Sequence, residues 1–372
     1  MISIRPKYFS HFKCDGKSCK SRCCKGWKVV VDGAAYSKYC SLKDETIRQE
    51  ILSKIERTDN QKRFIKMKSD QSCSFLDDDY LCKIQRRCGE EYLTAICHSY
   101  PRVSYKLGNI IEQSLTLTCP IAARLILLQK NPIEFDEVET EQPRGIFDWT
   151  SKLSIPVEEA LSIQATAISI LQDRHFDFNE RFMRLCVFLQ DESLKSQNNL
   201  YSDLDNNVET IIQIFSEMYN ADLTEEKTVN LQNIWTKYHK LILQRLMDNY
   251  AHIFENYLVN EFFMRCYPFA FDGGLWKNCK VFVTSYKFVE FALVLTAISK
   301  NGFVTVEEFL TMIDAVNEKL DHSRGGMKAI LNFANDELTC LTVIVVLLVS
   351  MRRPLTIVPT ARPLSLRPTK GE

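Results

Sequence analysis

Cysteines crowd into a short stretch near the start of the chain, and thiolate chemistry is what this stretch is best suited to. Four of them fall within eleven residues, namely Cys14, Cys19, Cys23 and Cys24. Several thiolates on one short segment repel one another unless a soft cation or an iron–sulfur core neutralises them. Gly16 and Gly26 favour tight backbone turns beside the sulfurs. The stretch is therefore predicted to be a metal-ligand loop.

A second set of cysteines lies further along the chain, at Cys73, Cys82, Cys97 and Cys119. We expect the two sets to form one site. Eight candidate thiolates exceed the four ligands that one tetrahedral zinc ion takes. This surplus favours an iron–sulfur cluster with further thiols beside it, or two metals, over a single structural zinc. His98, next to Cys97, is an additional candidate ligand.

The motifs around these cysteines resemble those of a known family. The chain reads C-x4-C-x3-C-C-x-G-W and later C-x-F-L, L-C-x-I-Q, G-E-x-x-L and C-x-x-Y-P-R. This combination resembles the flagellin lysine N-methylase family, whose cysteine-rich region is also similar to small zinc- or iron-chelating proteins. The resemblance covers residues 1–120, with a fainter echo at 260–269.

The resemblance implies a protein-lysine N-methyltransferase that uses S-adenosylmethionine to methylate lysine side chains on flagellin. It also implies a cysteine-ligated 4Fe-4S cluster and a place in the bacterial cytosol. The metal-ligand role carries over to Cys14, Cys19, Cys23, Cys24, Cys73, Cys82, Cys97 and Cys119. Cys40 and Cys88 fall outside the family pattern.

Two other functions fit the same cysteines. One is a module that stores or passes on zinc or iron, and the other is a structural zinc domain on a helical interaction protein, both without methyltransferase activity. The chain lacks the Gly-x-Gly turn of a dinucleotide-type cofactor site and the C-x3-C-x2-C spacing of radical enzymes. Residues that bind S-adenosylmethionine are therefore not identified from the sequence.

Methyl transfer to lysine requires a general base, because the acceptor amine must first lose a proton. Candidates in the motif region are Glu90, Glu91, Tyr92, Tyr100 and Tyr105. The sequence alone does not choose among them, so the catalytic residue stays unassigned at this point.

Charge is distributed unevenly along the chain. Residues 1–119 hold 22 Lys and Arg against 14 Asp and Glu, and residues 120–372 hold 25 against 33. The basic first region suits an anionic thiolate cluster, because nearby cations lower a thiol pKa. The acidic second region suits attraction of a basic, lysine-bearing protein surface. Nucleic acid is not an expected partner, since no groove-binding motif accompanies the scattered basic residues.

Two sequence patterns bear on cellular location, a secretory leader and an apolar run long enough to span a membrane. No secretory leader pattern opens the sequence, and its most apolar run, 340–349, is shorter than the roughly 20 residues of a membrane-spanning helix. We expect a cytoplasmic protein without a transmembrane segment. In a reducing compartment its cysteines would serve metal or redox chemistry more often than disulfides. A homo-oligomer is left open.

The expected fold is mainly α, with a cysteine-rich metal-binding N-terminal region followed by an α-helical domain. The predicted parts are a cysteine-rich region at 1–130, an acidic linker at 131–148, a helical domain at 149–350 and a disordered tail at 351–372. Within the first region we expect a strand at 28–31 and polar surface helices at 34–54 and 61–68.

Apolar residues recur at helical spacing through the second region, at 157–171, 182–189, 211–218 and 231–263. Thr305 and Glu308 form a capping-box pattern ahead of another apolar stripe at 310–320. These stripes are expected to form the core. The isolated cysteines within the region, at Cys186, Cys266, Cys279 and Cys340, are expected to be small buried residues.

Overall fold

The chain folds into two compact units in the computed structural model. The structure describes residues 1–14, 16, 19, 22–58, 60, 62–194, 224–322, 327–328 and 330–331. The first unit consists of Met1–Gln129 and Ile133–Leu153, and the second of Lys130–Pro132 and Ser154–Glu372.

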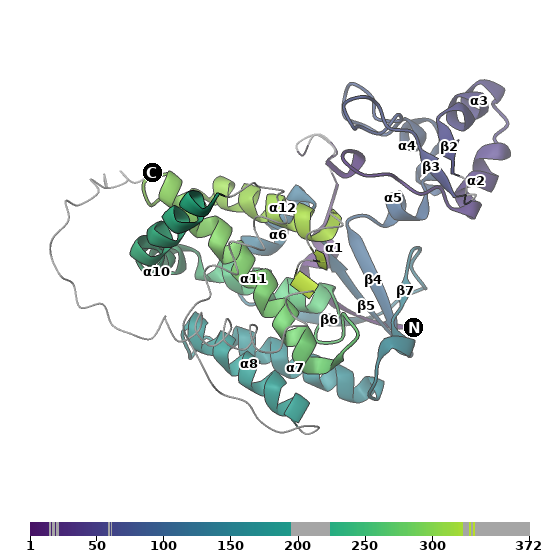
Figure 1. Cartoon of the computed structure of the whole chain (residues 1–372). Helices are drawn as coiled ribbons and strands as arrows, with labels where there is room; N and C mark the ends of the chain where they lie inside the picture. Colours follow the sequence, from purple (N-terminus) through teal and green to yellow (C-terminus); the bar gives the residue numbers. More distant parts are fainter. Residues whose placement is uncertain are drawn as a thin grey trace. The chain divides into compact units, whose positions relative to one another are not determined.

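A five-stranded mixed sheet forms one part of the first unit (Figure 1). Its strands are β1 (Ile2–Pro6), β4 (Arg102–Leu107), β5 (Ile110–Leu115), β6 (Phe135–Glu139) and β7 (Phe147–Asp148), in the order β6-β1-β5-β4-β7. β4 and β5 form a hairpin whose turn contains Gly108 at a φ of 58°, a conformation that glycine adopts without strain. β1 lies parallel to β5 and antiparallel to β6.

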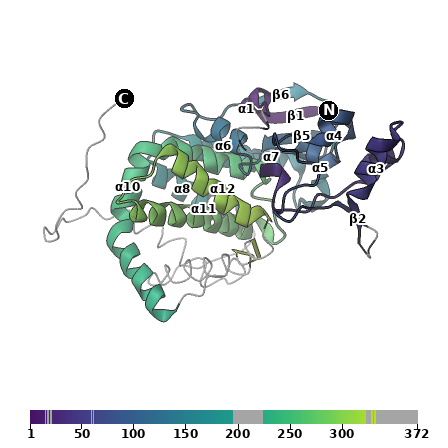
Figure 2. The same ribbon diagram turned by 90° about the horizontal axis from the view of Figure 1, so that it is seen from above.

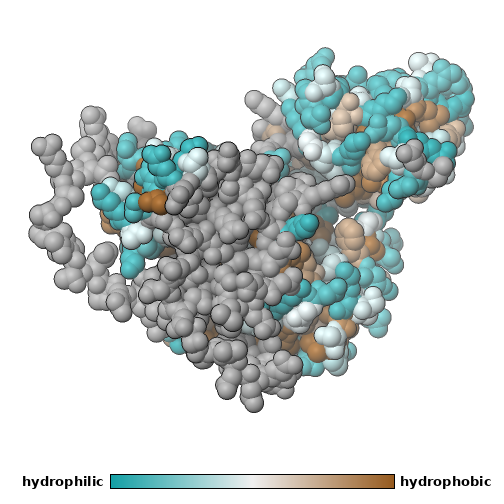
Figure 3. Space-filling model, in the orientation of Figure 1, coloured by the Kyte–Doolittle hydropathy of each residue, from teal (hydrophilic) through white to brown (hydrophobic). Residues whose placement is uncertain are grey.

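Short helices and two short strands make up the rest of the first unit. They are α1 (Tyr8–His11), η1 (Arg22–Cys24), α2 (Gly33–Cys40), α3 (Glu45–Ser53), β2 (Ile55–Arg57), β3 (Arg63–Ile65), α4 (Lys83–Cys88), η2 (Glu90–Tyr92), α5 (Ala95–Ser99), α6 (Pro120–Leu127) and η3 (Thr150–Lys152). Asp32 and Asp44 begin α2 and α3 by accepting hydrogen bonds from backbone N–H groups of the first turn. Figure 3 shows a largely hydrophilic outer surface over α2 and α3, as expected for polar surface helices.

The first unit differs from three sequence-based expectations. Segment 28–31 forms only an isolated bridge between Val30 and Phe64, and segment 61–68 contains β3, which pairs with β2 instead of forming a helix. The expected acidic linker, 131–148, contains β6, whose residues all pair with β1. Charged residues are common on an edge strand because water reaches them there, so the acidity of this segment did not indicate a linker.

The second unit is a helical bundle in the described residues. Its helices are α7 (Val157–Gln172), α8 (Phe178–Leu194), α10 (Glu225–Met264), α11 (Gly274–Ser299) and α12 (Val306–His322). α11 packs against α8, α10 and α12, and Figure 2 shows α12 running beside it. α10 bends at Tyr250, where the backbone leaves helical geometry.

α11 is the most deeply buried helix of this bundle. By length and composition it could cross a membrane, and 78% of its most apolar window is buried inside the structure. A largely apolar helix is typical of the core of a bundle when its neighbours cover it in this way.

The sequence predicted much of the second unit correctly. The capping box is confirmed, because Thr305 N donates to Glu308 Oε2 at 2.9 Å and Glu308 N donates to Thr305 Oγ1 at 3.3 Å. The cysteines predicted to be small buried residues are buried at Cys186, Cys266 and Cys279. The predicted helix at 211–218, Cys340 with the apolar run 340–349, and the predicted tail at 351–372 lie outside the described residues. The fold is thus mainly helical in its second unit, whereas the first unit carries a mixed sheet that was not predicted.

Candidate metal centre

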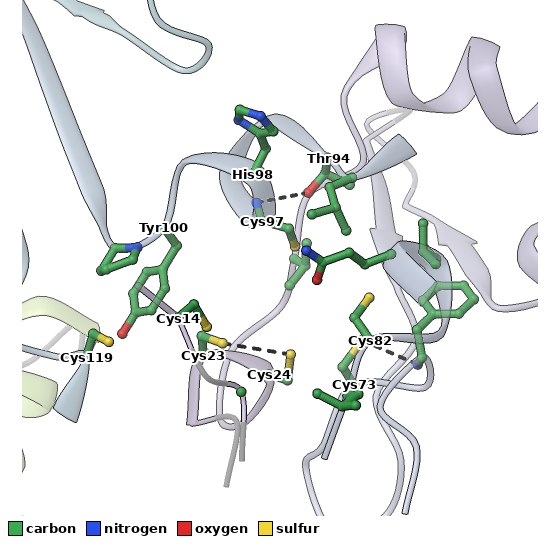
Figure 4. Close-up of a pocket in the computed structure, with 18 of the residues that line it drawn as sticks. Cys14, Cys23, Cys24, Cys73, Cys82, Thr94, Cys97, His98, Tyr100 and Cys119 are labelled. Carbon is green, nitrogen blue, oxygen red and sulfur yellow. Dashed lines mark hydrogen bonds between the residues drawn. The ribbon is translucent and has the colours of Figure 1, made fainter. Parts of the chain in front are cut away.

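One cavity of about 180 Å³ in the first unit is lined by every cysteine of both predicted sets. Those residues are Cys14, Cys19, Cys23, Cys24, Cys73, Cys82, Cys97 and Cys119. Figure 4 shows seven of them, with Cys73 and Cys82 at one end of the view and Cys119 beside Tyr100 at the other. Cys40 and Cys88 are not among the described lining residues. Both cysteine sets therefore line the same cavity, and their sharing of one metal site stays a prediction.

Backbone pairing joins the two cysteine sets directly. Cys73 N donates to Cys24 O at 2.7 Å, and Gly26 N donates to Gln71 O at 3.0 Å. Gly26 has a φ of 81°, so the chain turns sharply after the paired cysteines, as predicted. The indole Nε1 of Trp27 donates to Cys23 O at 2.8 Å and fixes the end of the same segment. This short antiparallel contact places the cysteines of η1, Cys23 and Cys24, next to Cys73, which follows β3.

Three further cysteines sit at the start of short helices or in their first turn. Cys82 and Cys119 directly precede α4 and α6, and Pro120 occupies the first turn of α6. Cys97 lies in α5, whose first residue follows Thr94, and Thr94 Oγ1 accepts a hydrogen bond from Cys97 N at 3.3 Å. The starts of α4, α5 and α6 therefore position the thiols of Cys82, Cys97 and Cys119 in the cavity wall.

Burial is the largest influence on the thiol pKa of Cys73, Cys82, Cys97 and Cys119. It raises the pKa of Cys73 and Cys82 above the ordinary value, and it raises the pKa of Cys97 and of Cys119 to about 12. Backbone N–H groups at the helix starts act in the opposite direction on Cys82 and Cys119, without overcoming burial. The expectation that the basic first region lowers the thiol pKa is wrong for these four, because the cavity wall is mostly apolar.

Cys23 and Cys24 form a coupled pair, with their sulfurs 4.0 Å apart. The hydrogen bond from Cys24 lowers the pKa of Cys23, whereas the same contact, together with burial, raises the pKa of Cys24. Cys23 therefore loses its proton before Cys24, and the Cys24 thiol stabilises the Cys23 thiolate.

The donor types in the cavity fit a soft metal or an iron–sulfur core, because thiolates are the ligands that both prefer. Their spacing in this structure is wider, since no three Cys, His, Asp or Glu side chains in the described ranges lie close enough to hold a metal ion. Binding would require the sulfurs to draw together. It would also supply the positive charge that buried thiolates need in order to form.

Other side chains give the cavity wall its polarity. Glu90, His98, Tyr100 and Arg102 line it, and His98 Nε2 lies 3.8 Å from Glu90 Oε1. Glu91, Tyr92 and Tyr105, the other candidate bases, are not among its described lining residues. Tyr105 instead packs edge-on against Trp149 with ring centroids 5.1 Å apart.

Two lining residues were not singled out from the sequence. Arg102 stands in the C-x-x-Y-P-R motif and lies over the Phe12 ring at 5.2 Å, so the motif itself contained the signal. Tyr39 belongs to a polar helix with few apolar residues, and only the tertiary structure shows that it is fully buried. Burial and nearby thiols raise the pKa of Tyr39.

The fold and the site define a class of proteins with a cysteine-lined cavity in a mixed α/β unit and a helical second unit. Residues 194–347 match the FliB lysine N-methylase C-terminal domain. The chain is 36% identical over 126 residues to the flagellar biosynthetic protein FliU of Salmonella muenchen, a match that spans 33% of this chain and 75% of FliU. The chain therefore belongs to the flagellin lysine N-methylase family.

Curated relatives with an enzyme name are similar over a smaller part of their length. The chain is 33% identical over 136 residues to the lysine-N-methylases of Salmonella choleraesuis (strain SC-B67) and Salmonella typhimurium (strain LT2). Each match spans 36% of this chain and 34% of the relative, so the chain aligns with about a third of these two proteins. No solved structure matches the chain significantly.

Proposed function

We propose that this protein methylates lysine side chains of flagellin in the bacterial cytosol, with S-adenosylmethionine as methyl donor and a cysteine-held 4Fe-4S cluster as cofactor. The observation that carries the proposal is the convergence of all eight predicted cysteines on one cavity in a chain of the lysine N-methylase family. The names of the curated relatives, FliU and lysine-N-methylase, support the reaction and its link to flagella.

The cavity supplies the ligands for the cluster. At most four thiolates would hold a 4Fe-4S cluster, and they would come from the eight that line this space, namely Cys14, Cys19, Cys23, Cys24, Cys73, Cys82, Cys97 and Cys119. A bound 4Fe-4S cluster supplies electron-transfer chemistry, and an iron without a cysteine ligand supplies a coordination position. Arg102 lines the same cavity.

The methyl transfer itself requires a proton acceptor. The carbon–sulfur bond to the transferred methyl breaks, the lysine nitrogen forms the new bond, and S-adenosylhomocysteine leaves with the electron pair. The lysine ammonium must first give a proton to a base. Glu90 and Tyr100 are the candidate bases that line the cavity, and we favour Glu90 because its Oε1 lies 3.8 Å from Nε2 of the lining residue His98.

The test uses full-length protein purified and reduced without oxygen, mixed with flagellin and S-adenosylmethionine. We expect the intact mass of flagellin to rise by whole multiples of one methyl group. Cys24→Ser should abolish the increase because it removes a thiol of the cavity, whereas Cys40→Ser should retain it because Cys40 is exposed and lies away from the cavity. Unmodified flagellin after incubation with protein whose cluster is shown to be intact would remove the enzyme proposal.

A metal-handling module is the second candidate, and the donor set of the cavity also favours it. Such a module would pass iron or zinc to an acceptor protein and leave the flagellin mass unchanged. Measuring the metal content of the acceptor in the same incubation separates the two functions.

A further inference from the structure

Tyr39 is a buried hydroxyl-bearing residue in the wall of the cysteine cavity. It projects from α2 and has no exposed surface. Its hydroxyl oxygen has no hydrogen-bond partner in the described part of the chain. A hydroxyl buried in this way costs about 1–3 kcal/mol relative to a paired one. Phenylalanine would fill the same space without that cost, so the hydroxyl needs an explanation.

The surroundings of Tyr39 limit what its hydroxyl can meet. The ring belongs to an apolar cluster that includes Val29, Phe75 and Ile84. Against the same cluster pack the cysteines Cys24, Cys82, Cys88 and Cys97, of which all but Cys88 line the cavity. Asp32 is the carboxylate close to Tyr39, and its two oxygens already accept hydrogen bonds from Ala35 N and Ala95 N. The cysteine sulfurs are therefore the acceptors left to the Tyr39 hydroxyl among these neighbours.

We propose that the Tyr39 hydroxyl donates a hydrogen bond to a sulfur of the metal centre and thereby sets the affinity and the reduction potential of that centre. This inference rests on the proposed function, since it requires a thiolate-held cluster in the cavity. Tyr39 is a positioning residue under this proposal, because it acts through the sulfur and does not touch the substrate.

The physical effect of such a bond has a defined sign. A donor to a cluster sulfur stabilises the more negative, reduced form more than the oxidised form, and it therefore raises the reduction potential. The low dielectric of the apolar cluster strengthens the effect. Removing the donor should make the potential more negative and weaken retention of the metal.

The experiment compares wild type, Tyr39→Phe and Tyr286→Phe as full-length proteins, with and without anaerobic reconstitution by iron and sulfide. Tyr286 is the matched control, because it is also almost fully buried but belongs to α11 in the second unit. Three quantities are measured: iron and sulfide per chain, the midpoint potential by redox titration followed by electron paramagnetic resonance, and the thermal unfolding midpoint.

We expect Tyr39→Phe to shift the midpoint potential to a more negative value and Tyr286→Phe to leave it unchanged. Without metal, Tyr39→Phe should unfold at the same temperature as wild type or higher, because an unpaired hydroxyl is gone. With metal, its gain in unfolding temperature should be smaller than that of wild type. A merely structural role for Tyr39 predicts no change in potential.

Two results would overturn the inference, and they are distinguishable. If wild type binds iron and sulfide, and Tyr39→Phe shows the same potential and the same gain on loading, the hydrogen bond does not exist while the proposed cluster stands. If wild type itself takes up no iron and sulfide, the inference fails together with the cluster on which it rests.

Discussion

Glu90 and Glu91 are adjacent in sequence but have different surroundings, and this difference makes Glu90 the proposed base. Glu90 lines the cysteine cavity and lies near His98, whereas Glu91 contributes its backbone carbonyl to Lys38 Nζ at 2.6 Å and lines a different pocket. The sequence offered five candidates at equal weight. It could not separate them, because which of two neighbouring side chains faces a cavity depends on η2 and on its packing.

Substitution of the two adjacent acids tests this assignment. We expect Glu90→Gln to lower the rate of flagellin methylation by about 10²–10⁴-fold, the usual contribution of a general base. Glu91→Gln is the matched control and should stay close to wild type. The iron content of each variant, measured in parallel, shows that the centre is retained. Equal rates for Glu90→Gln and wild type would transfer the role to Tyr100, for which Tyr100→Phe and the packed Tyr105→Phe are the corresponding pair.

At the scale of single elements, the helix starts were the most predictable features of the chain. The Thr305 and Glu308 capping box was recognised from spacing alone, because its hydrogen bonds are local and need no tertiary partner. β6 was missed for the opposite reason. Its pairing with β1 joins residues more than a hundred positions apart, and no local pattern encodes such a contact.

The capping box makes α12 sensitive to acid. A hydrogen bond from Lys300 and those from the Thr305 backbone lower the pKa of Glu308 from its ordinary value of 4.5 to about 2. A lowered carboxyl pKa stabilises the folded state above pH 4.5, and this stabilisation is lost as the pH falls towards 2. Urea unfolding of wild type and Glu308→Gln should therefore differ at pH 6 and converge near pH 2. A difference that stays constant over this range would show that the charge of Glu308 has no role.

A buried cluster of charges joins α10 to α8 and to the turn that precedes α8. Glu255 in α10 has a side chain that is 1% exposed, and it accepts from Arg181 Nη1 at 2.6 Å and from Arg174 Nη2 at 2.8 Å. No local sequence pattern predicts this contact, because Glu255 lies 81 positions from Arg174 and 74 from Arg181.

Removal of Glu255 should be costly, because it leaves Arg181 buried without its counter-charge. We expect Glu255→Gln to lower the free energy of unfolding by about 3–5 kcal/mol. Glu180→Gln breaks the more exposed pair with Arg184 and should cost about 0–1 kcal/mol. Urea unfolding of both variants gives the comparison. Similar small losses would mean that the bundle relaxes to let water reach Arg181.

For the whole molecule, the sequence predicted which cysteines belong together but not the scaffold that places them around one cavity. Eight cysteines were assigned to one site, and all eight line one cavity. Residue type and motif carried that information. The mixed sheet, the pairing of Cys73 with Cys24 and the burial of Tyr39 depend on contacts between distant segments, so they could be seen only in the structure. Burial of Cys73, Cys82, Cys97 and Cys119 raises the pKa of these four thiols, which is opposite to the expected direction.

The central claim is that both cysteine sets hold a single iron–sulfur centre, and metal analysis of full-length protein purified without oxygen tests it most directly. We expect about four iron and four acid-labile sulfide per chain in wild type. Cys23→Ser and Cys82→Ser, one from each set, should each lose most of both, whereas exposed Cys40→Ser should match wild type. Stoichiometric zinc without sulfide in wild type, or full iron occupancy in both cavity variants, would contradict the account.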